Sequence, residues 1–265
     1  FGDPRIVERF VAWTGRPARF ARYTSRTLYP GVRDDDKDKI RLKPIGDYYV
    51  RNLELAATAD PPQRATAAAL VEELKKRGKW PAKPDLLRWY GARGSRWRDG
   101  KSGAFRRAIT LEGDPELVTR HEVQAAPPDI LVTNYSMLEY MLMRPLERPI
   151  FDHTRAWLER NPEERFLLVV DEAHLYRGAA GAEVALLIRR LRARLGISED
   201  RLQVICTSAS FQDAQNAVRF GAHLTGKNAG DFDTVQGQLL LRAGEEKGGF
   251  ADAEALDAVD LAAFF

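Results

Sequence analysis

The stretch LLVVDEAH, residues 167–174, is a short hydrophobic run that ends abruptly in two adjacent carboxylates. A run of this length followed at once by charge is typical of a buried strand that reaches the edge of a sheet. There the first carboxylate, Asp171, can hold Mg²⁺, and the second, Glu172, can orient or deprotonate an attacking water. Since buried carboxylates without partners are costly, the pair predicts a functional site. The alternative is a chance Asp-Glu pair at a strand-to-loop junction.

Two further hydrophobic runs end in small polar residues in the same way. The sequence ILVTN occupies residues 130–134, and VICTS occupies residues 204–208. Apolar residues at helical spacing lie between the runs, over residues 136–143 and 184–195. Buried strands that alternate with helices predict an α/β fold with a parallel sheet. Ligands of such sheets bind outside the carboxyl ends of the strands, where these polar residues are expected.

These segments carry a resemblance to a known family. Asp171-Glu172-Ala173-His174 resembles motif II of superfamily 2 helicases, the DEAD/DEAH-box group, and Thr207-Ser208-Ala209-Ser210 resembles motif III. The sequence PPDILVTNYSMLEYML, residues 127–142, resembles the segment that follows motif Ia. The continuation after motif II is similar to bacterial helicases of the mitomycin-repair-factor type and to phage-defence helicases. The resemblance is clear over residues 111–230 and weak over residues 19–31.

The resemblance implies an incomplete RecA-like domain, with a parallel sheet flanked by helices and a helical or irregular insertion. ATP and Mg²⁺ are the implied cofactors. Asp171 would position the Mg²⁺ of ATP through water, Glu172 would polarise the attacking water, and His174 would contact the γ-phosphate side or motif III. The motif III residues Thr207, Ser208, Ala209 and Ser210 would couple hydrolysis to movement.

The implied nucleic-acid partner, expected to be DNA, would be held through its phosphates at the strand ends. The residues expected there are Thr133, Asn134, Arg22 and Thr24. A second candidate is the segment 88–107, which holds seven Lys or Arg and one acid, Asp99. Basic and aromatic residues together suit phosphates and stacked bases, so Arg93, Arg96 and Arg98 are candidate contacts. The alternative is a solvated, mobile loop.

Two expected parts of such a motor have no counterpart in the sequence. A phosphate-binding loop ends in Gly-Lys-Thr or Gly-Lys-Ser after a strand. Gly100-Lys101-Ser102 follows no buried run, and Ser95 stands where the first glycine is required, so we do not interpret it as that loop. We therefore expect a fragment of a longer helicase, whose second RecA-like domain is a partner alongside other proteins. The alternative is a RecA-like scaffold that binds nucleic acid or protein without hydrolysing ATP.

Composition bounds the remaining possibilities. The chain has 265 residues, of which 44% are hydrophobic, and a formal net charge of +3, so a core can form. One cysteine excludes a disulfide framework and a zinc site of several thiolates. No apolar run reaches the roughly 18 residues of a membrane span, and we expect a cytoplasmic protein without a membrane partner. The expected limits are 1–33 with 111–248 for the RecA-like part, 34–110 for the insertion and 249–265 for an acidic segment.

Overall fold

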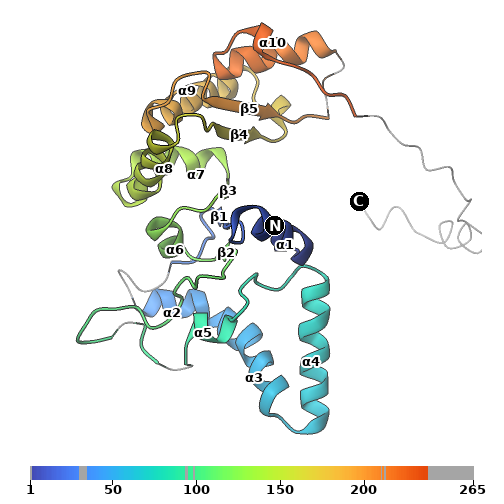
Figure 1. Cartoon of the computed structure of the whole chain (residues 1–265), viewed down its shortest axis with the longest axis vertical. Coiled ribbons are helices and arrows are strands. Elements are labelled where there is room, and N and C mark those ends of the chain that lie inside the picture. The colour runs from blue at the N-terminus through green and yellow to red at the C-terminus, as the bar shows by residue number, and fades with distance from the viewer. Residues whose placement is uncertain are drawn as a thin grey trace, which may run out of the picture.

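The structure, a computed structural model, describes residues 2–29, 35–92, 95–97, 99–209, 211 and 213–237, and for residues 35–39 it describes the backbone alone. The segment expected at 249–265 therefore lies outside the described residues. Helices α2–α5 lie at one end of the molecule and β4, β5 and α10 at the other, with the first three strands between them (Figure 1). No helix within these ranges is both long enough and apolar enough to cross a membrane.

Helices dominate the first part of the chain. Its elements are α1 (Pro4–Thr14), β1 (Phe20–Tyr23), α2 (Asp35–Pro44), the π-helix η1 (Ile45–Val50), α3 (Arg51–Thr58), α4 (Pro61–Lys76) and α5 (Leu86–Tyr90). Helix α1 ends where Gly15 takes a left-handed φ of 79°. Helix α4 begins after Asp60, whose side chain accepts a hydrogen bond from the backbone N–H of Gln63.

Strands alternate with helices in the second part of the chain. Its elements are β2 (Glu116–Leu117), α6 (Arg120–Ala125), β3 (Ile130–Thr133), α7 (Tyr135–Met143), η2 (Pro145–Glu147), α8 (Arg148–Arg160), β4 (Phe166–Val170), η3 (Ala173–Leu175), α9 (Gly178–Leu195), β5 (Leu202–Cys206), α10 (Ala214–Thr225) and η4 (Ala229–Asp231). The predicted strands are β3, β4 and β5, and the helices predicted between them are α7 and α9. Each strand ends at the polar residues that the sequence indicates.

All strand pairs of the described chain are parallel, which confirms the predicted α/β class with parallel strands flanked by helices. One ladder has the order β2-β1-β3, and β4 pairs with β5 in a second ladder. In the first ladder Tyr23 is opposite Thr133, and in the second Val170 is opposite Cys206. The strands expected in one sheet therefore lie in two ladders, and no backbone pairing between β3 and β4 is described.

The strands are buried on one face, which corrects the expectation of fully buried strands. Alternate side chains of β4, Phe166 and Leu168, pack against the core. The side chains between them point to the other face, where Leu167 is 51% and Val169 is 54% exposed. Val132 of β3 is likewise exposed, at 53%. The core side chains of α7, α8 and α9 cover the buried face, and the opposite face has no such cover from the described residues.

The buried apolar residues form two clusters. The first joins β1 and β4 to helices α7–α9, with Tyr23, Met141 and Leu191 among its members. The second lies within residues 42–108 and contains the buried indoles Trp89 and Trp97. The sequence-derived division into 1–33 with 111–248 and 34–110 stays a prediction.

The basic segment 88–107 is not simply a solvated loop, because Arg107 is buried in it. The Arg107 guanidinium packs against both the Tyr90 ring and the Trp97 ring, 4.1 and 4.0 Å from their centroids. Its Nε donates to the carbonyl of Tyr90 over 2.8 Å, and its Nη1 donates to the carbonyl of Ser95 over 3.1 Å. Arg107 therefore holds the second cluster together through stacking and directed hydrogen bonds.

We expect Arg107→Ala to lower the free energy of unfolding by about 2–4 kcal/mol. The substitution removes a stacked cation and leaves the carbonyls of Tyr90 and Ser95 without their donor. Arg107→Lys should recover only part of the loss, since an ammonium group lacks the planar fork. Arg88, which is exposed in the same segment, supplies the control Arg88→Ala. Equal urea midpoints for the Arg107 and Arg88 variants would contradict a structural role for the stacked guanidinium.

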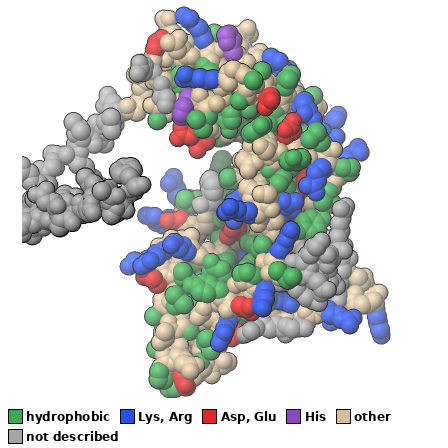
Figure 2. Space-filling view, turned by 180° about the vertical axis from the view of Figure 1, so that it is seen from behind, with side chains coloured by type: hydrophobic (Ala, Val, Ile, Leu, Met, Phe, Trp, Pro, Cys, Tyr) green, Lys and Arg blue, Asp and Glu red, His purple; other side chains and the backbone are tan. Residues whose placement is uncertain are grey.

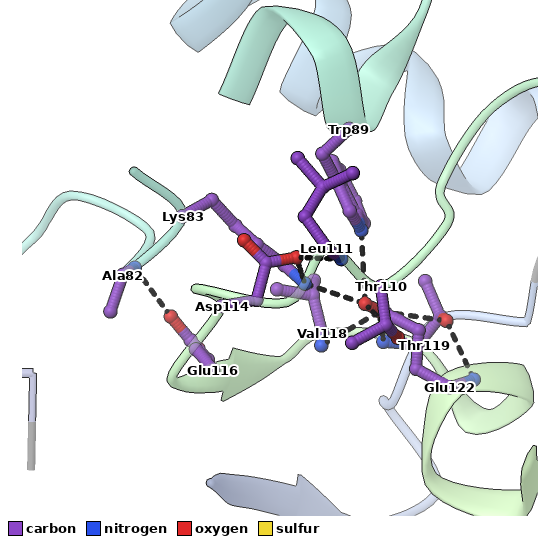
Figure 3. A network of polar contacts seen from close by, with 10 residues as sticks. All are labelled: Ala82, Lys83, Trp89, Thr110, Leu111, Asp114, Glu116, Val118, Thr119 and Glu122. Atoms are coloured by element: carbon purple, nitrogen blue, oxygen red, sulfur yellow. Dashed lines mark hydrogen bonds and ion pairs between the residues drawn. The ribbon is translucent and has the colours of Figure 1, made fainter. Parts of the chain in front are cut away.

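A buried network of charged side chains connects the segment before α5 to the start of α6 (Figure 3). Lys83 Nζ donates to Asp114 over 2.8 Å and to Glu122 over 2.5 Å, and all three side chains are at most 1% exposed. The indole N–H of Trp89 donates to the same oxygen of Glu122 over 3.0 Å. Thr119 and Glu122 also form the capping box that begins α6.

Candidate active site

The predicted motif II and motif III lie side by side because their strands pair in parallel. The backbone pairing continues beyond both strands: the Thr207 N–H donates to the carbonyl of Val170 over 3.0 Å. The Ala173 N–H donates back to the carbonyl of Thr207 over 2.8 Å. Two backbone hydrogen bonds thus fix the position of the loop after β4 relative to the loop after β5.

Side chains of the two motifs also contact each other. The Thr207 hydroxyl donates to Asp171 Oδ1. His174 Nδ1 lies 3.1 Å from Ser208 Oγ and 3.3 Å from Glu172 Oε2. When Nδ1 carries a proton it can donate to either of these oxygens, because a carboxylate and a hydroxyl can each accept a hydrogen bond. The structure therefore brings together five residues that the sequence predicts to share a site.

Glu172 has a backbone conformation that the sequence does not reveal. Its φ of 50° and ψ of 43° are left-handed, and among the described non-glycine residues only Ala108 also has a positive φ. This conformation costs roughly 1 kcal/mol in an L-residue with a long side chain. The hydrogen bond from Ala173 N–H to Thr207 holds the backbone in place directly after Glu172.

The two carboxylates of motif II are groups that could hold a magnesium ion. The carboxylates of Asp171 and Glu172 are exposed at the strand ends, so a bound phosphate or water can reach them. Mg²⁺ prefers hard oxygen ligands and commonly takes one or two carboxylates together with phosphates and water. Asp171 with the adjacent Thr207 hydroxyl fits that requirement. Among the described residues no cluster of three or more His, Cys, Asp or Glu forms a metal cage.

The predicted nucleic-acid contacts on β1 and β3 are neighbours in the structure, since Tyr23 pairs with Thr133. The Thr133 hydroxyl donates to the carbonyl of Tyr23 over 2.7 Å, which joins the two strand ends. Asn134 caps α7 by accepting the N–H of Met137 over 2.8 Å. The carbonyl of Thr24 accepts Arg120 Nη2 over 2.8 Å. These residues therefore have local structural roles, while the Arg22 side chain is exposed.

Of the basic contacts predicted in the segment 88–107, the structure describes Arg96 alone. Arg93, Arg98 and the motif III residue Ser210 lie outside the described residues. Arg96 is exposed and precedes Trp97 of the second cluster. Lys and Arg side chains are spread over the visible face rather than gathered in one patch (Figure 2).

The Gly100-Lys101-Ser102 segment has the geometry of a side-chain-capped turn. Asp99 Oδ1 accepts the backbone N–H groups of Ser102 and Lys101, each over 2.9 Å. These two hydrogen bonds lower the pKa of Asp99 to about 2. The backbone donors that a phosphate would need are thus occupied by a carboxylate, and the preceding element is the helix α5. The geometry agrees with the interpretation that this segment is no phosphate loop.

A pocket beside motif II was not foreseen from the sequence. It measures about 330 Å³ and lies between the start of α9 and α10, with Tyr176, Arg177, Phe220 and His223 in its wall. The small residues at the start of α9 are the signal that could have indicated it. A Cβ at Gly181 would lie 2.6 Å from the carbonyl oxygen of Tyr176, so glycine permits this close approach.

Comparison with known proteins places these features in a family. The model of the DEAD/DEAH box helicase family matches residues 61–218, which begin at α4 and include both motifs. No solved structure gives a significant match.

Curated relatives agree with the family match. The chain is 40% identical over 278 residues to Druantia protein DruE of Escherichia coli (strain UMEA 4076-1), covering 100% of this chain and 14% of that protein. It is 32% identical over 114 residues to the uncharacterized ATP-dependent helicase MJ1574 of Methanocaldococcus jannaschii, a match that covers 43% of this chain and 15% of that protein. It is also 32% identical over 121 residues to the uncharacterized ATP-dependent helicase YprA of Bacillus subtilis (strain 168), a match that covers 46% of this chain and 14% of that protein. The chain thus spans 14% to 15% of the length of these relatives. Together with the paired motifs at the ends of β4 and β5, the match shows that this chain belongs to the DEAD/DEAH box helicase family.

Proposed function

We propose that this chain carries the motif II and motif III part of the ATPase site of a nucleic-acid helicase or translocase that acts on DNA. The observation that carries the proposal is the contact between the two motifs at the ends of β4 and β5. Asp171 accepts a hydrogen bond from the Thr207 hydroxyl there, and His174 Nδ1 contacts both Glu172 and Ser208. An isolated Asp-Glu pair at a strand end would not need these partners.

The residues divide the chemistry among themselves. Mg²⁺-bound ATP would supply the phosphoryl group, and Asp171 would hold the metal ion directly or through water. Glu172 would orient the attacking water and accept its proton. His174, with a proton on Nδ1, would donate to Glu172 Oε2 and so orient that carboxylate, while the contact between His174 and Ser208 would connect motif II to the loop after β5. Thr207 and Ser208 would thereby link the state of the nucleotide to the position of β5.

Nucleic acid would bind at the ends of β1 and β3, where Arg22 is exposed. Thr24, Thr133 and Asn134 would present backbone and side-chain groups to the phosphates, and their local hydrogen bonds keep the two strand ends in register. Phosphate contacts of this kind fix position without reading sequence.

The direct test is ATP hydrolysis by the full-length protein, measured with and without single-stranded DNA, double-stranded DNA and RNA. We expect Mg²⁺-dependent hydrolysis that DNA stimulates more strongly than RNA. Nucleic-acid binding without any hydrolysis would favour the scaffold alternative. Equal stimulation by RNA would contradict the assignment of DNA as the substrate.

We expect Arg22→Ala to weaken DNA binding and to reduce the slope of log K against log salt by about 1. One lost phosphate contact releases about one counterion fewer on binding. Arg64→Ala is the matched control, because Arg64 is an exposed arginine on α4. Arg96→Ala tests the segment 88–107 in the same titration. An unchanged slope in Arg22→Ala would exclude Arg22 from the interface, and an unchanged slope in Arg96→Ala would do the same for Arg96.

A further inference from the structure

The end of β3 and the loop after β4 are connected by side chains. The described strands form two separate ladders, so no backbone hydrogen bonds between β3 and β4 are described. Packed side chains are therefore one route by which movement of β1 and β3 relative to β4 and β5 can reach the DEAH loop. One such contact joins the rings of Tyr135 and Tyr176, whose centroids lie 6.3 Å apart with an interplanar angle of 66°.

Tyr135 lies beside the candidate nucleic-acid site, and Tyr176 lies beside the candidate ATPase site. Tyr135 is the first residue of α7 and directly follows Thr133 and Asn134. Tyr176 follows the DEAH sequence by two positions and ends η3, where its N–H donates to the carbonyl of Ala173 over 3.0 Å. The edge-to-face pair thus lies between the strand ends proposed to meet nucleic acid and the loop proposed to meet ATP.

The backbone of Tyr176 has little room to move independently of its surroundings. Its carbonyl oxygen is packed so closely on α9 that a Cβ at Gly181 would lie only 2.6 Å away. Its ring is packed against the first hydrophobic cluster. Its N–H bond to Ala173 connects it to the residue that Thr207 also holds. A displacement of the Tyr176 ring is therefore passed to the backbone of motif II.

We propose that Tyr135 and Tyr176 are positioning residues that couple nucleic-acid binding at the ends of β1 and β3 to ATP hydrolysis at motif II. The inference rests on the proposed function. Neither ring touches the reacting atoms; their contact sets where the DEAH loop lies when α7 shifts. Removal of the contact then leaves DNA binding and basal ATP hydrolysis intact, but DNA binding no longer stimulates hydrolysis to the same extent. Couplings between sites in proteins typically change an affinity or a response about 5–150-fold.

The test compares full-length variants in which the ring is lost or kept. Tyr135→Leu and Tyr176→Leu remove the aromatic pair, whereas Tyr135→Phe and Tyr176→Phe keep it. Tyr140→Leu is the matched control, because Tyr140 lies on α7 and is 55% exposed. For each variant, the measurements are ATP hydrolysis without DNA, the affinity for single-stranded DNA, and the factor by which saturating DNA stimulates hydrolysis.

We expect both leucine variants to keep basal hydrolysis and DNA affinity within about twofold, while the stimulation factor falls at least about fivefold. The phenylalanine variants and Tyr140→Leu should behave as the unmodified protein. The double leucine variant should lose no more stimulation than either single variant, because the two rings act through one contact. A structural defect would lower all three measurements together and would not produce this separation.

The outcomes distinguish the inference from the proposal on which it rests. Absence of ATP hydrolysis in the unmodified protein would overturn both. DNA-stimulated hydrolysis that persists in the leucine variants, or additive losses in the double variant, would overturn the coupling role alone. If Tyr176→Leu lowers the melting temperature, the result for Tyr135→Leu decides whether the coupling role holds. Tyr135 is 39% exposed, and its replacement leaves the buried cluster unchanged.

Discussion

Replacement of Glu172 by glutamine is expected to lower the rate of ATP hydrolysis of the full-length protein by about 100-fold or more, with ATP binding retained. Glutamine has the same shape, and its amide oxygen can still accept a hydrogen bond from His174 Nδ1, so the contacts of the loop persist. It carries no negative charge and cannot take a proton from water. The loss should therefore appear in kcat, with little change in the affinity for nucleotide.

The control for this prediction is Glu183→Gln. Glu183 is exposed on α9, downstream of the same loop, and its replacement changes the net charge by the same amount. Hydrolysis is measured under saturating ATP and DNA, and binding is measured with a fluorescent nucleotide. Turnover close to that of the unmodified protein in Glu172→Gln would show that another group activates the water.

Replacement of Lys83 by methionine is expected to lower the free energy of unfolding by about 3–5 kcal/mol. Methionine fills most of the volume but leaves Asp114 and Glu122 buried without the ammonium group that they share. Asp114→Asn should cost less, about 1–2 kcal/mol, because the Lys83–Glu122 ion pair remains and the amide oxygen can still accept hydrogen bonds from Lys83 and from the Leu111 N–H. The order of the two losses separates the effect of charge from the effect of packing.

Hydrogen exchange locates this effect in the structure. The N–H groups of Val118 and Thr119 donate to Glu122 Oε2 over 3.1 and 3.0 Å, so their exchange should accelerate in Lys83→Met. Lys79→Met, at an exposed lysine four residues away, is the control and should change stability by less than about 0.5 kcal/mol. Equal urea midpoints for the Lys83 and Lys79 variants would contradict the role of the network.

The sequence predicts the strands and their ends because that information is local. A hydrophobic run followed by Asp171 or Thr207 marks both the strand and the place where it stops. The proximity of the two motifs follows as well, since parallel neighbouring strands end at the same edge. The family resemblance, which the family match confirms, adds the expected helicase-like chemistry.

Features that depend on distant partners could not be predicted in this way. A lysine is expected at the surface because an unpaired buried charge is costly, yet Lys83 finds its two carboxylates 31 and 39 residues away. Arg107 likewise becomes a core residue because its guanidinium packs on the rings of Tyr90 and Trp97. The exposed side chains of β4 were expected inside, since a hydrophobic run does not say how many faces of its strand are covered.

The left-handed backbone of Glu172 has a consequence for how this position can change in evolution. Glycine is the residue that relaxes such a φ most readily, and it would remove the carboxylate. Substitutions that favour a more stable fold at residue 172 are thus the ones that abolish the chemistry proposed for it. Selection for stability and selection for turnover act in opposite directions on this single codon.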